Sequence, residues 1–170
     1  MKDELDHRPA LPRDAAFVVD SWSDSYRTSY AAGLSPMPLY QKHIRESLAW
    51  LFTERKPQVL IAYRPDGTGY DIYGWICFER GLTAPQQVRE GGKFVTRVMP
   101  IGVVVHYLYV KEAYRRLGIA RYLFKVAGID LRSDWIFSCK TAASERITKR
   151  LAPHARWNPL LARFPNTGQR

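Results

Sequence analysis

A strand-like run that passes through one glycine into a helix-like run constrains the fold of this chain most strongly. The segment VMPIGVVVHYLYV, residues 98–110, is rich in β-branched and aromatic residues and predicts a buried strand. The next segment, KEAYRRLGIARYLFK at 111–125, has apolar residues at helical spacing, namely Leu117, Ala120, Leu123 and Phe124. Gly118 lies where the strand would turn into the helix. A strand, a turn and a helix in this order predict an α/β protein.

The rest of the chain extends this pattern to an element order of helix, helix, three strands, helix, strand, helix and a tail with room for one more strand. The predicted ranges are helices 14–33 and 35–55, strands 59–63 and 70–79, a mobile loop at 80–97, strand 134–139 and helix 141–151. Turn residues between the first two strands predict an antiparallel hairpin. The later strand, helix and strand predict a right-handed parallel crossover, and therefore a mixed sheet.

The composition predicts one packed domain. The chain has 170 residues, of which 46% are hydrophobic and 13% aromatic. We expect residues 1–12 to be a flexible lead-in and residues 13–170 to form a single domain. No run reaches the roughly 18 apolar residues of a membrane span, and the polar start does not resemble a signal peptide. We therefore expect a cytoplasmic protein with no membrane partner.

The two cysteines and the scattered histidines indicate no metal site. Cys77 and Cys139 each lie in an apolar run, which favours reduced, buried thiols over a disulfide or a metal centre. His7 and His43 have no companions at ligand spacing. We expect no metal cofactor.

Positive charge gathers in the C-terminal third. Residues 1–110 carry 13 basic and 12 acidic side chains, whereas residues 111–170 carry 13 basic and 4 acidic ones, out of a total net charge of +10. A local excess of positive charge favours an anionic partner, such as a phosphorylated cofactor or a nucleic acid. The alternative is a basic, solvated face without a partner.

The turn around Gly118 has the chemistry of a phosphate site. The first turn of a helix has backbone N–H groups without partners, and a glycine there lets a phosphate approach them. Arg115 and Arg116 add charged donors at the same place. The turn therefore predicts anion binding, with a pyrophosphate as the best fit, although a glycine can also serve only to permit a tight bend.

The segment R-x-x-G-x-A, residues 115–120, resembles the coenzyme A signature of the GNAT superfamily of N-acetyltransferases, and the order of elements resembles that fold over nearly the whole chain. The resemblance implies an acetyl-CoA-dependent transfer of an acetyl group to a primary amine by direct attack in a ternary complex. It implies that the pyrophosphate is held by Arg115, Arg116, Leu117, Gly118, Ile119 and Ala120. It also implies that Leu108, Tyr109 and Val110 pair with the pantetheine arm, in a gap where the signature strand splays from its parallel neighbour.

The same resemblance suggests which groups do the chemistry. Removing a proton from the amine requires a base, and His106 occupies the position where arylalkylamine-type members carry a base histidine. A satisfied core histidine or a substrate-positioning residue are the alternatives. The amide of Leu108 would serve the oxyanion by analogy.

A proton donor for the departing thiolate is harder to assign. Many relatives carry a tyrosine in the helix after the gap, but here Ile147 stands at that position. Tyr109 and Ser144 are therefore the candidate donors, with water or Tyr107 as alternatives, and Thr141 is a candidate cofactor contact. Helix capping is the alternative for the two hydroxyl residues of the helix start.

The acceptor side is the least determined by the sequence. In the resembled fold the first two helices shape it, which makes Trp22, Tyr26 and Tyr30 candidate substrate contacts, with core packing as the alternative. The excess of positive charge permits two other functions, an acyltransferase that modifies a DNA or RNA base amine and a non-catalytic basic nucleic-acid-binding domain. The missing tyrosine and the R-W-N-P tail also resemble the phage Mom-type DNA-modifying branch. The oligomeric state stays open.

Overall fold

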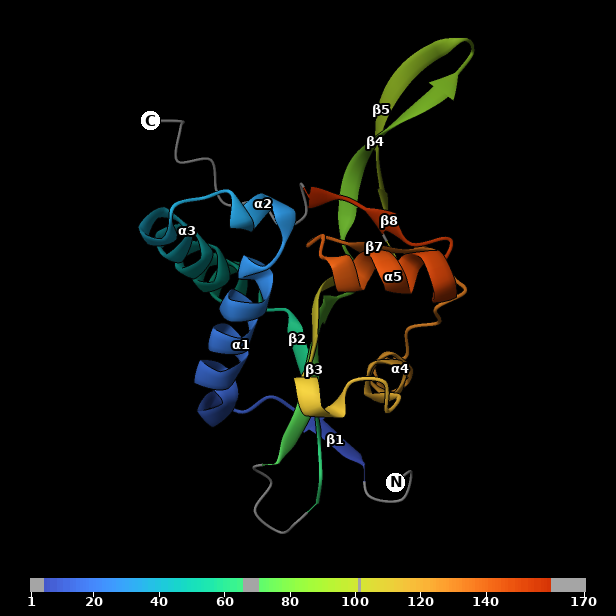
Figure 1. The fold of residues 1–170 in the computed structure, drawn as a ribbon. Helices are drawn as coiled ribbons and strands as arrows, with labels where there is room; N and C mark the ends of the chain where they lie inside the picture. The colour runs from blue at the N-terminus through green and yellow to red at the C-terminus, as the bar shows by residue number, and fades with distance from the viewer. Residues whose placement is uncertain (1–4, 66–70, 101, 160–170) are drawn as a thin grey trace.

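A six-stranded mixed sheet runs through the middle of the molecule (Figure 1). The computed structural model describes residues 5–65, 71–100 and 102–159. The sheet has the order β1-β2-β3-β6-β7-β8, with β1 Asp6–Pro9, β2 Gln58–Tyr63, β3 Ile72–Glu79, β6 Val103–Val110, β7 Trp135–Phe137 and β8 Arg156–Trp157. The pairs from β1 to β6 are antiparallel and those from β6 to β8 are parallel. The predicted α/β fold with a mixed sheet is confirmed.

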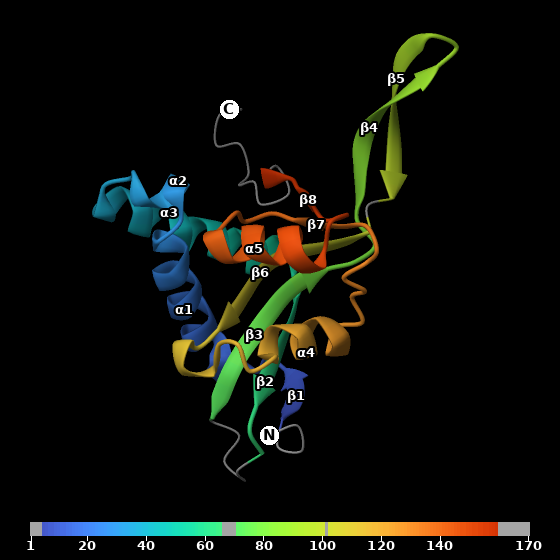
Figure 2. The ribbon, with the colours of Figure 1, turned by 45° about the vertical axis from the view of Figure 1, so that its right-hand side comes forward.

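Helices cover both faces of the sheet (Figure 2). One face carries α1 Ala15–Arg27, α2 Tyr30–Gly33 and α3 Met37–Trp50, and the other carries α4 Ile119–Val126 and α5 Ala142–Leu151. Each face has its own apolar core. Trp22 and Trp75 lie in the core under α1 and α3, whereas Phe78 and Leu123 lie in the core under α4.

The two predicted N-terminal helices are present with changed limits. The predicted helix 14–33 is interrupted after Arg27, because Ser29 adopts an extended conformation and its side chain caps α2 by accepting from the amide of Ala32. The helix predicted over 35–55 is α3 followed by a π-helical turn, Leu51–Arg55. Lys56, with a φ of 50°, ends it just before the proline.

The N-terminal segment belongs to the sheet. The prediction of a flexible lead-in over residues 1–12 is wrong for Asp6–Pro9, which pairs with β2 as the edge strand β1. Arg8 on this strand donates both terminal nitrogens to the buried carboxylate of Asp14, just before α1. The polar, proline-containing sequence concealed this strand because a short edge strand needs no alternating apolar pattern.

The predicted loop at 80–97 is also wrong. Strands β4 Thr83–Glu90 and β5 Lys93–Pro100 pair with each other and project from the sheet as a two-stranded arm (Figure 1). Gly91 and Gly92, with φ of 55° and 83°, form the tight turn between them. The strand predicted over 98–110 is consequently divided, with β5 ending at Pro100 and β6 beginning at Val103.

A β-bulge at His106 reverses the facing of β6. The β3–β6 ladder pairs Cys77 with Tyr107 and Phe78 with Val105, so that His106 is the extra residue. Val105 packs under α4, and Leu108 three residues later packs there too, although strict alternation would send it to the other face. The bulge therefore directs the side chains of His106 and Tyr107 in succession toward the α1 and α3 side.

Candidate active site

The parallel pair β6–β7 opens just after it begins. The two strands pair from Val103 with Trp135 to Val105 with Phe137, and one further bond joins the amide of Ser138 to the carbonyl of Val105 at 3.1 Å. Beyond that point the chain after β7 leaves for α5, while β6 continues to Val110. The structure thus contains the splayed strand pair that the sequence predicted.

The open edge of β6 presents backbone groups to this gap. The amide of Lys111 donates to Tyr73 on β3, and Tyr109 pairs with Trp75 on the same side. Because backbone groups of successive residues alternate in direction along a strand, those of Leu108 and Val110 point away from β3, into the gap. An extended polar chain could pair with them there.

The turn before α4 gathers free amides. Arg116 and Gly118 both adopt left-handed conformations, with φ of 68° and 86°. Gly118 is the N-cap of α4 and provides no side-chain cap. Among the described residues, no acceptor bonds the amides of residues 116–121, and the first bond of the helix is that from Tyr122 to the carbonyl of Gly118. Such a row of donors at a helix start is suited to an anion.

Space and charge around this turn also suit an anion. A Cβ atom built on Gly118 would meet nothing within 4 Å, so the amides are open to solvent. The side chains of Arg115, Arg116 and Arg121 are exposed beside them. Arg115 is held at the end of β6 by a bond from its Nε to the carbonyl of Val110 at 3.3 Å.

A chain of buried polar groups lies on the α3 side of the opening. Nδ1 of His106 is 2.9 Å from Oγ of Ser138, and Nε2 is 3.0 Å from Oε1 of Glu79. Arg55, from the turn after α3, donates to the other oxygen of Glu79 at 2.7 Å. His106 is only 1% exposed and Ser138 only 3%. We name Arg55, Glu79, His106 and Ser138 the polar relay.

The charge state of the relay follows from its contacts. Burial alone would raise the pKa of Glu79, but hydrogen bonds from His106 and Arg55 outweigh it and hold that pKa below its usual value. Glu79 is therefore an ionised carboxylate paired with a cation inside the protein. A buried carboxylate in this position orients an imidazole and stabilises the charge that it acquires on taking a proton.

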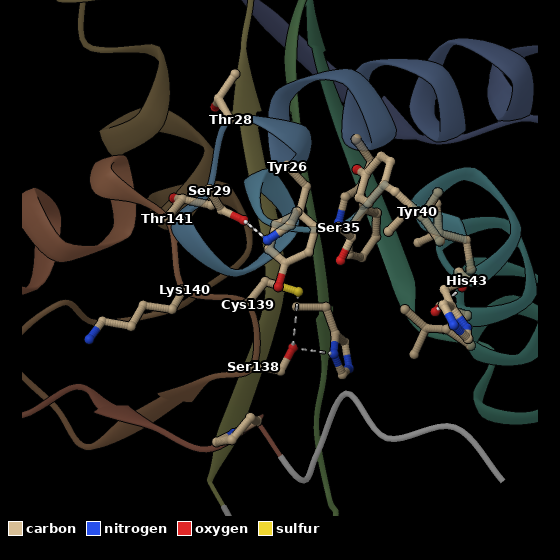
Figure 3. Close-up of a pocket in the computed structure, with 18 of the residues that line it drawn as sticks. Tyr26, Thr28, Ser29, Ser35, Tyr40, His43, Ser138, Cys139, Lys140 and Thr141 are labelled. Atoms are coloured by element: carbon tan, nitrogen blue, oxygen red, sulfur yellow. Dashed lines mark hydrogen bonds between the residues drawn. The ribbon is translucent and has the colours of Figure 1, made fainter. Parts of the chain in front are cut away.

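Two cavities flank the opening. The larger, of about 740 Å³, lies between the helices α1 to α3 and the start of α5, and its walls include Trp22, Tyr26, Tyr40, Ser138 and Lys140 (Figure 3). The smaller, of about 60 Å³, lies in the splay between β6 and α5, with Leu108, Phe124 and Ile147 in its walls. We name them the acceptor cavity and the slot.

The acceptor cavity and the slot meet at the relay. His106, Cys139 and Thr141 line both of them. A molecule in one cavity would therefore lie across this shared wall from a molecule in the other. Such an arrangement is suited to the transfer of a group between two bound partners.

The fold of the chain is similar to those of acetyltransferases. The structure described as histone acetyltransferase HPA2 and related acetyltransferase from Corynebacterium glutamicum matches with a TM-score of 0.55 and 13% identity, over 87% of this chain and 83% of that one. The chain has the GNAT acetyltransferase fold. A GNAT family acetyltransferase from Brucella melitensis, in complex with acetyl-CoA, matches with a TM-score of 0.47 and 19% identity, over 84% and 80%. Neither a family model nor a curated protein matches the sequence.

Most of the residues predicted to hold the cofactor lie along one path, but the backbone of Tyr109 is directed toward Trp75 on β3, so its predicted pairing with the pantetheine arm is wrong. Residues 115–118 form the turn before α4 and residues 119–120 begin this helix, while Leu108 lines the slot and the backbone of Val110 faces the gap. The side chain of Ile119 is buried under α4, so only its amide is available. Their binding role stays a prediction.

Tyr109 and Ser144, the predicted proton donors, make other contacts in the structure. Tyr109 packs its ring against Phe17 and Trp75, each at 6.1 Å between centroids, on the α1 side of the sheet. Ser144 lies in the slot but forms a capping box with Thr141, accepting from its amide at 2.8 Å and donating to its carbonyl at 2.9 Å. Thr141 and Ser144 therefore both cap the start of α5, as the capping alternative predicts, and Thr141 also lines both cavities.

The predicted substrate contacts lie in the acceptor cavity as far as the structure describes them. Trp22 and Tyr26 line it, and both rings pack against Tyr107, that of Trp22 stacked at 4.8 Å. Trp22 and Tyr26 therefore pack in the apolar core and also form part of the cavity wall. The side chain of Tyr30 lies outside the described residues.

Sequence reasoning found His106 but missed its partners. In the sequence, Ser138 lies inside the predicted strand 134–139, Glu79 ends the predicted strand 70–79, and Arg55 ends the predicted helix 35–55. The signal that could have found Glu79 is its place directly after the apolar run IYGWICF, because a carboxylate buried with such a strand needs a cation. For Ser138 the sequence contains no comparable signal.

The two cysteines form no disulfide in the structure. Cys77 and Cys139 are free thiols, and burial raises the pKa of both, that of Cys139 to about 12. No group of three or more potential metal ligands occurs in the described part of the chain. The same residues include no helix with the length and apolar character to cross a membrane.

Proposed function

We propose that the protein transfers an acetyl group from acetyl-CoA to a primary amine by direct attack in a ternary complex. The observation that carries this proposal is the shared wall of the slot and the acceptor cavity at His106, where the β6–β7 ladder parts. A thioester arm lying along β6 would end beside that wall. An amine in the acceptor cavity would reach it from the other side.

The residues divide into three roles under this proposal. The free amides of residues 116–121, with Arg115 and Arg116, hold the pyrophosphate. The backbone of Leu108 and Val110 pairs with the pantetheine arm, and the Leu108 amide is directed toward the developing oxyanion. His106 receives the proton that the amine loses, with Glu79 stabilising the resulting charge.

The acceptor cavity supports a small or extended amine rather than a flat surface contact. Its volume of about 740 Å³ is within the range of small-molecule sites, and aromatic rings from α1 and α3 form much of its wall. Lys140, at its edge, is paired with Glu145 at 3.0 Å. An amine bound in this cavity would contact apolar and hydroxyl groups, with the carboxylate of Glu145 at the edge of the cavity.

Binding and turnover test the proposal separately. Calorimetric titration with acetyl-CoA should give saturable binding that weakens at least 10-fold in Arg115→Glu, because the charge beside the free amides is reversed. The charge-matched control is Arg89→Glu on the β4–β5 arm, which should bind like the wild type. No binding of acetyl-CoA or CoA at millimolar concentration would end the proposal.

Turnover is followed by thiol release over a panel of amines, peptides and nucleic acids. His106→Ala should keep acetyl-CoA binding and lose at least 100-fold in kcat, which is typical for the loss of a base. An unchanged kcat in this variant would assign the histidine to the core alone.

A further inference from the structure

The base in this site has no free nitrogen with which to meet an amine. Both ring nitrogens of His106 are engaged, Nδ1 by Ser138 at 2.9 Å and Nε2 by Glu79 at 3.0 Å. The ring is 1% exposed, so it cannot rotate toward the cavity without breaking both contacts. Any proton that reaches His106 must therefore arrive through one of these two partners.

The contacts also fix the direction in which the proton can move. The ionised carboxylate of Glu79 can only accept a hydrogen bond, so Nε2 of His106 carries the hydrogen. In the neutral ring Nδ1 then has the lone pair and accepts from the hydroxyl of Ser138. The only other described acceptor of this hydroxyl, the sulfur of Cys139, lies 4.0 Å away. The hydroxyl oxygen keeps its own lone pairs for a donor in the cavity.

Ser138 faces one cavity and not the other. It lines the acceptor cavity, whereas the described walls of the slot include its neighbours His106 and Cys139 but not Ser138 itself. The thioester would enter through the slot, and the amine would lie in the acceptor cavity. Ser138 is thus placed to contact the amine rather than to attack the thioester.

We propose that Ser138 is a catalytic residue, the group that contacts the acceptor amine and passes its proton to His106. The proposal rests on the proposed acetyl transfer and names the atom through which His106 acts. The acceptor ammonium gives a proton to Oγ of Ser138 while the hydroxyl proton moves to Nδ1 of His106. The net result is a neutral amine, an unchanged serine and an imidazolium paired with Glu79.

The following bond changes balance. The amine lone pair forms the C–N bond at the thioester carbonyl carbon, and the C–S bond breaks with its electron pair on sulfur. The nitrogen loses one more proton, which the thiolate takes up. The proton on His106 returns through Ser138 to solvent, so that one ammonium and one thioester give one amide, one thiol and one proton.

Arg55 holds the far end of this path. Its Nε and Nη2 both donate to Oε2 of Glu79, at 3.2 and 2.7 Å, which leaves Oε1 for His106. The carboxylate is therefore fixed in position and remains an acceptor. The phenols of Tyr26 and Tyr40 and the thiol of Cys139 face the same cavity, and burial raises the pKa of each, so they stay neutral near neutral pH. The remaining titratable groups of the cavity wall are His43, Lys140 and Glu145.

The test compares Ser138→Ala with Ser138→Thr, which keeps the hydroxyl. The alanine variant should bind acetyl-CoA with the wild-type Kd and lose about 100-fold in kcat at pH 7, the scale of one general-base contribution. The threonine variant should recover at least a tenth of the wild-type kcat. The control is Ser25→Ala, which removes a hydroxyl bonded to Tyr107 at 2.9 Å on the same side of the sheet and should leave kcat within about 2-fold.

The pH profile separates a relay from a merely structural serine. Without the relay the reaction depends on amine that is already neutral in solution. The kcat of Ser138→Ala should therefore keep rising with pH toward the pKa of the acceptor, while the wild type levels off earlier. A parallel loss at every pH would assign Ser138 a structural role and overturn the proposal.

Two further measurements keep the result unambiguous. Nitrogen-15 NMR of the histidine-labelled wild type, without any substrate, should show the neutral His106 ring with its hydrogen on Nε2; a hydrogen on Nδ1 would overturn the relay whether or not the protein acetylates amines. Mass spectrometry after mixing with acetyl-CoA alone should show unmodified Ser138, and an acetyl-serine would replace the relay by a nucleophile. A wild type that binds but never turns over acetyl-CoA would contradict the proposed function, while the NMR result would still decide the relay.

Discussion

Arg55 and Glu79 form an ion pair beneath the acceptor cavity, with 2.7 Å between Nη2 and Oε2. The carboxylate is 6% exposed and the arginine side chain 18%. Losing the arginine would leave a buried charge with one neutral partner, and removing one member of such a pair is costly. We expect Arg55→Met to lower the free energy of unfolding by about 3 kcal/mol in urea titrations.

The β4–β5 arm provides a matched control for this ion pair. Arg97 and Glu90 are also joined at 2.7 Å, but both are exposed on the β4–β5 arm. Arg97→Met should change the free energy of unfolding by less than about 1 kcal/mol. Equal losses in the two variants would contradict the assigned burial of the Arg55 pair.

The Arg8–Asp14 pair should give the protein an acid-sensitive component of stability. Hydrogen bonding from Arg8 lowers the pKa of Asp14 below its ordinary 3.8, against the opposing effect of burial. A depressed pKa in the folded state stabilises the protein above the unfolded-state value, and this stabilisation is lost as the pH falls through the folded-state value. Asp14→Asn should therefore be less stable than the wild type at pH 7, with a difference that shrinks below about pH 4. Urea titrations from pH 7 to pH 3 measure it, and a constant difference would contradict the pair.

Gly118 should matter for binding more than for folding. Its φ of 86° disfavours any side chain, yet a Cβ there meets nothing within 4 Å, so Gly118→Ala should cost only about 1 kcal/mol of stability. The added methyl projects beside free amides, and we expect the Kd for acetyl-CoA to rise at least 10-fold. Gly91→Ala is the control, since that glycine has a φ of 55° and equally open space on the arm. This variant should bind acetyl-CoA normally and lose no more than about 1 kcal/mol of stability.

Cys139 should resist alkylation in the native protein. Burial raises the pKa of its thiol to about 12, so that the reactive thiolate is scarce at pH 7.5. Cys77 is fully enclosed in the sheet, and burial raises its pKa as well. Mass spectrometry after iodoacetamide should find both thiols unmodified in buffer and both modified in urea. Fast labelling of native Cys139 would indicate a thiolate and a different electrostatic environment.

The β4–β5 arm should be dispensable for folding. The described side chains of β5 are all exposed, and the two strands pair only with each other. Thr83 and Pro100 are direct partners, so two or three glycines can join them in place of residues 84–99. The shortened protein should retain its circular dichroism and its free energy of unfolding within about 1 kcal/mol. An unfolded product would show that the arm contributes to the core.

The sequence predicts this fold best where local chemistry decides the structure. The β-branched run of β6 and the glycine before α4 specify a strand, a turn and a helix without help from distant residues. The arm was predictable in principle, because Gly91 and Gly92 between Val88 and Phe94 form a hairpin signal that the polar composition obscured. The edge strand β1 was not, since its pairing with β2 depends on tertiary structure.

The candidate site was predictable only in part. His106 could be proposed because its position in a local strand resembles that of a base histidine in the GNAT superfamily, and the turn around Gly118 could be proposed as a phosphate site from its local chemistry. Glu79 and Ser138 lie 27 and 32 residues away from it in the chain and meet it only across the sheet. Their positions beside His106 follow from strand order and from the bulge, which the pattern of apolar residues does not encode.

The bulge at His106 places one more residue in β6 than the neighbouring strand can match. Before the bulge the odd-numbered side chains of β6 face α4, and after it the odd-numbered side chains face α1. Removing this extra residue would restore regular alternation and leave Tyr107 and Leu108 on their present faces. An alignment of this strand with a strand that lacks the bulge must therefore be offset by one at this position, or one half will be compared with the wrong side of the sheet.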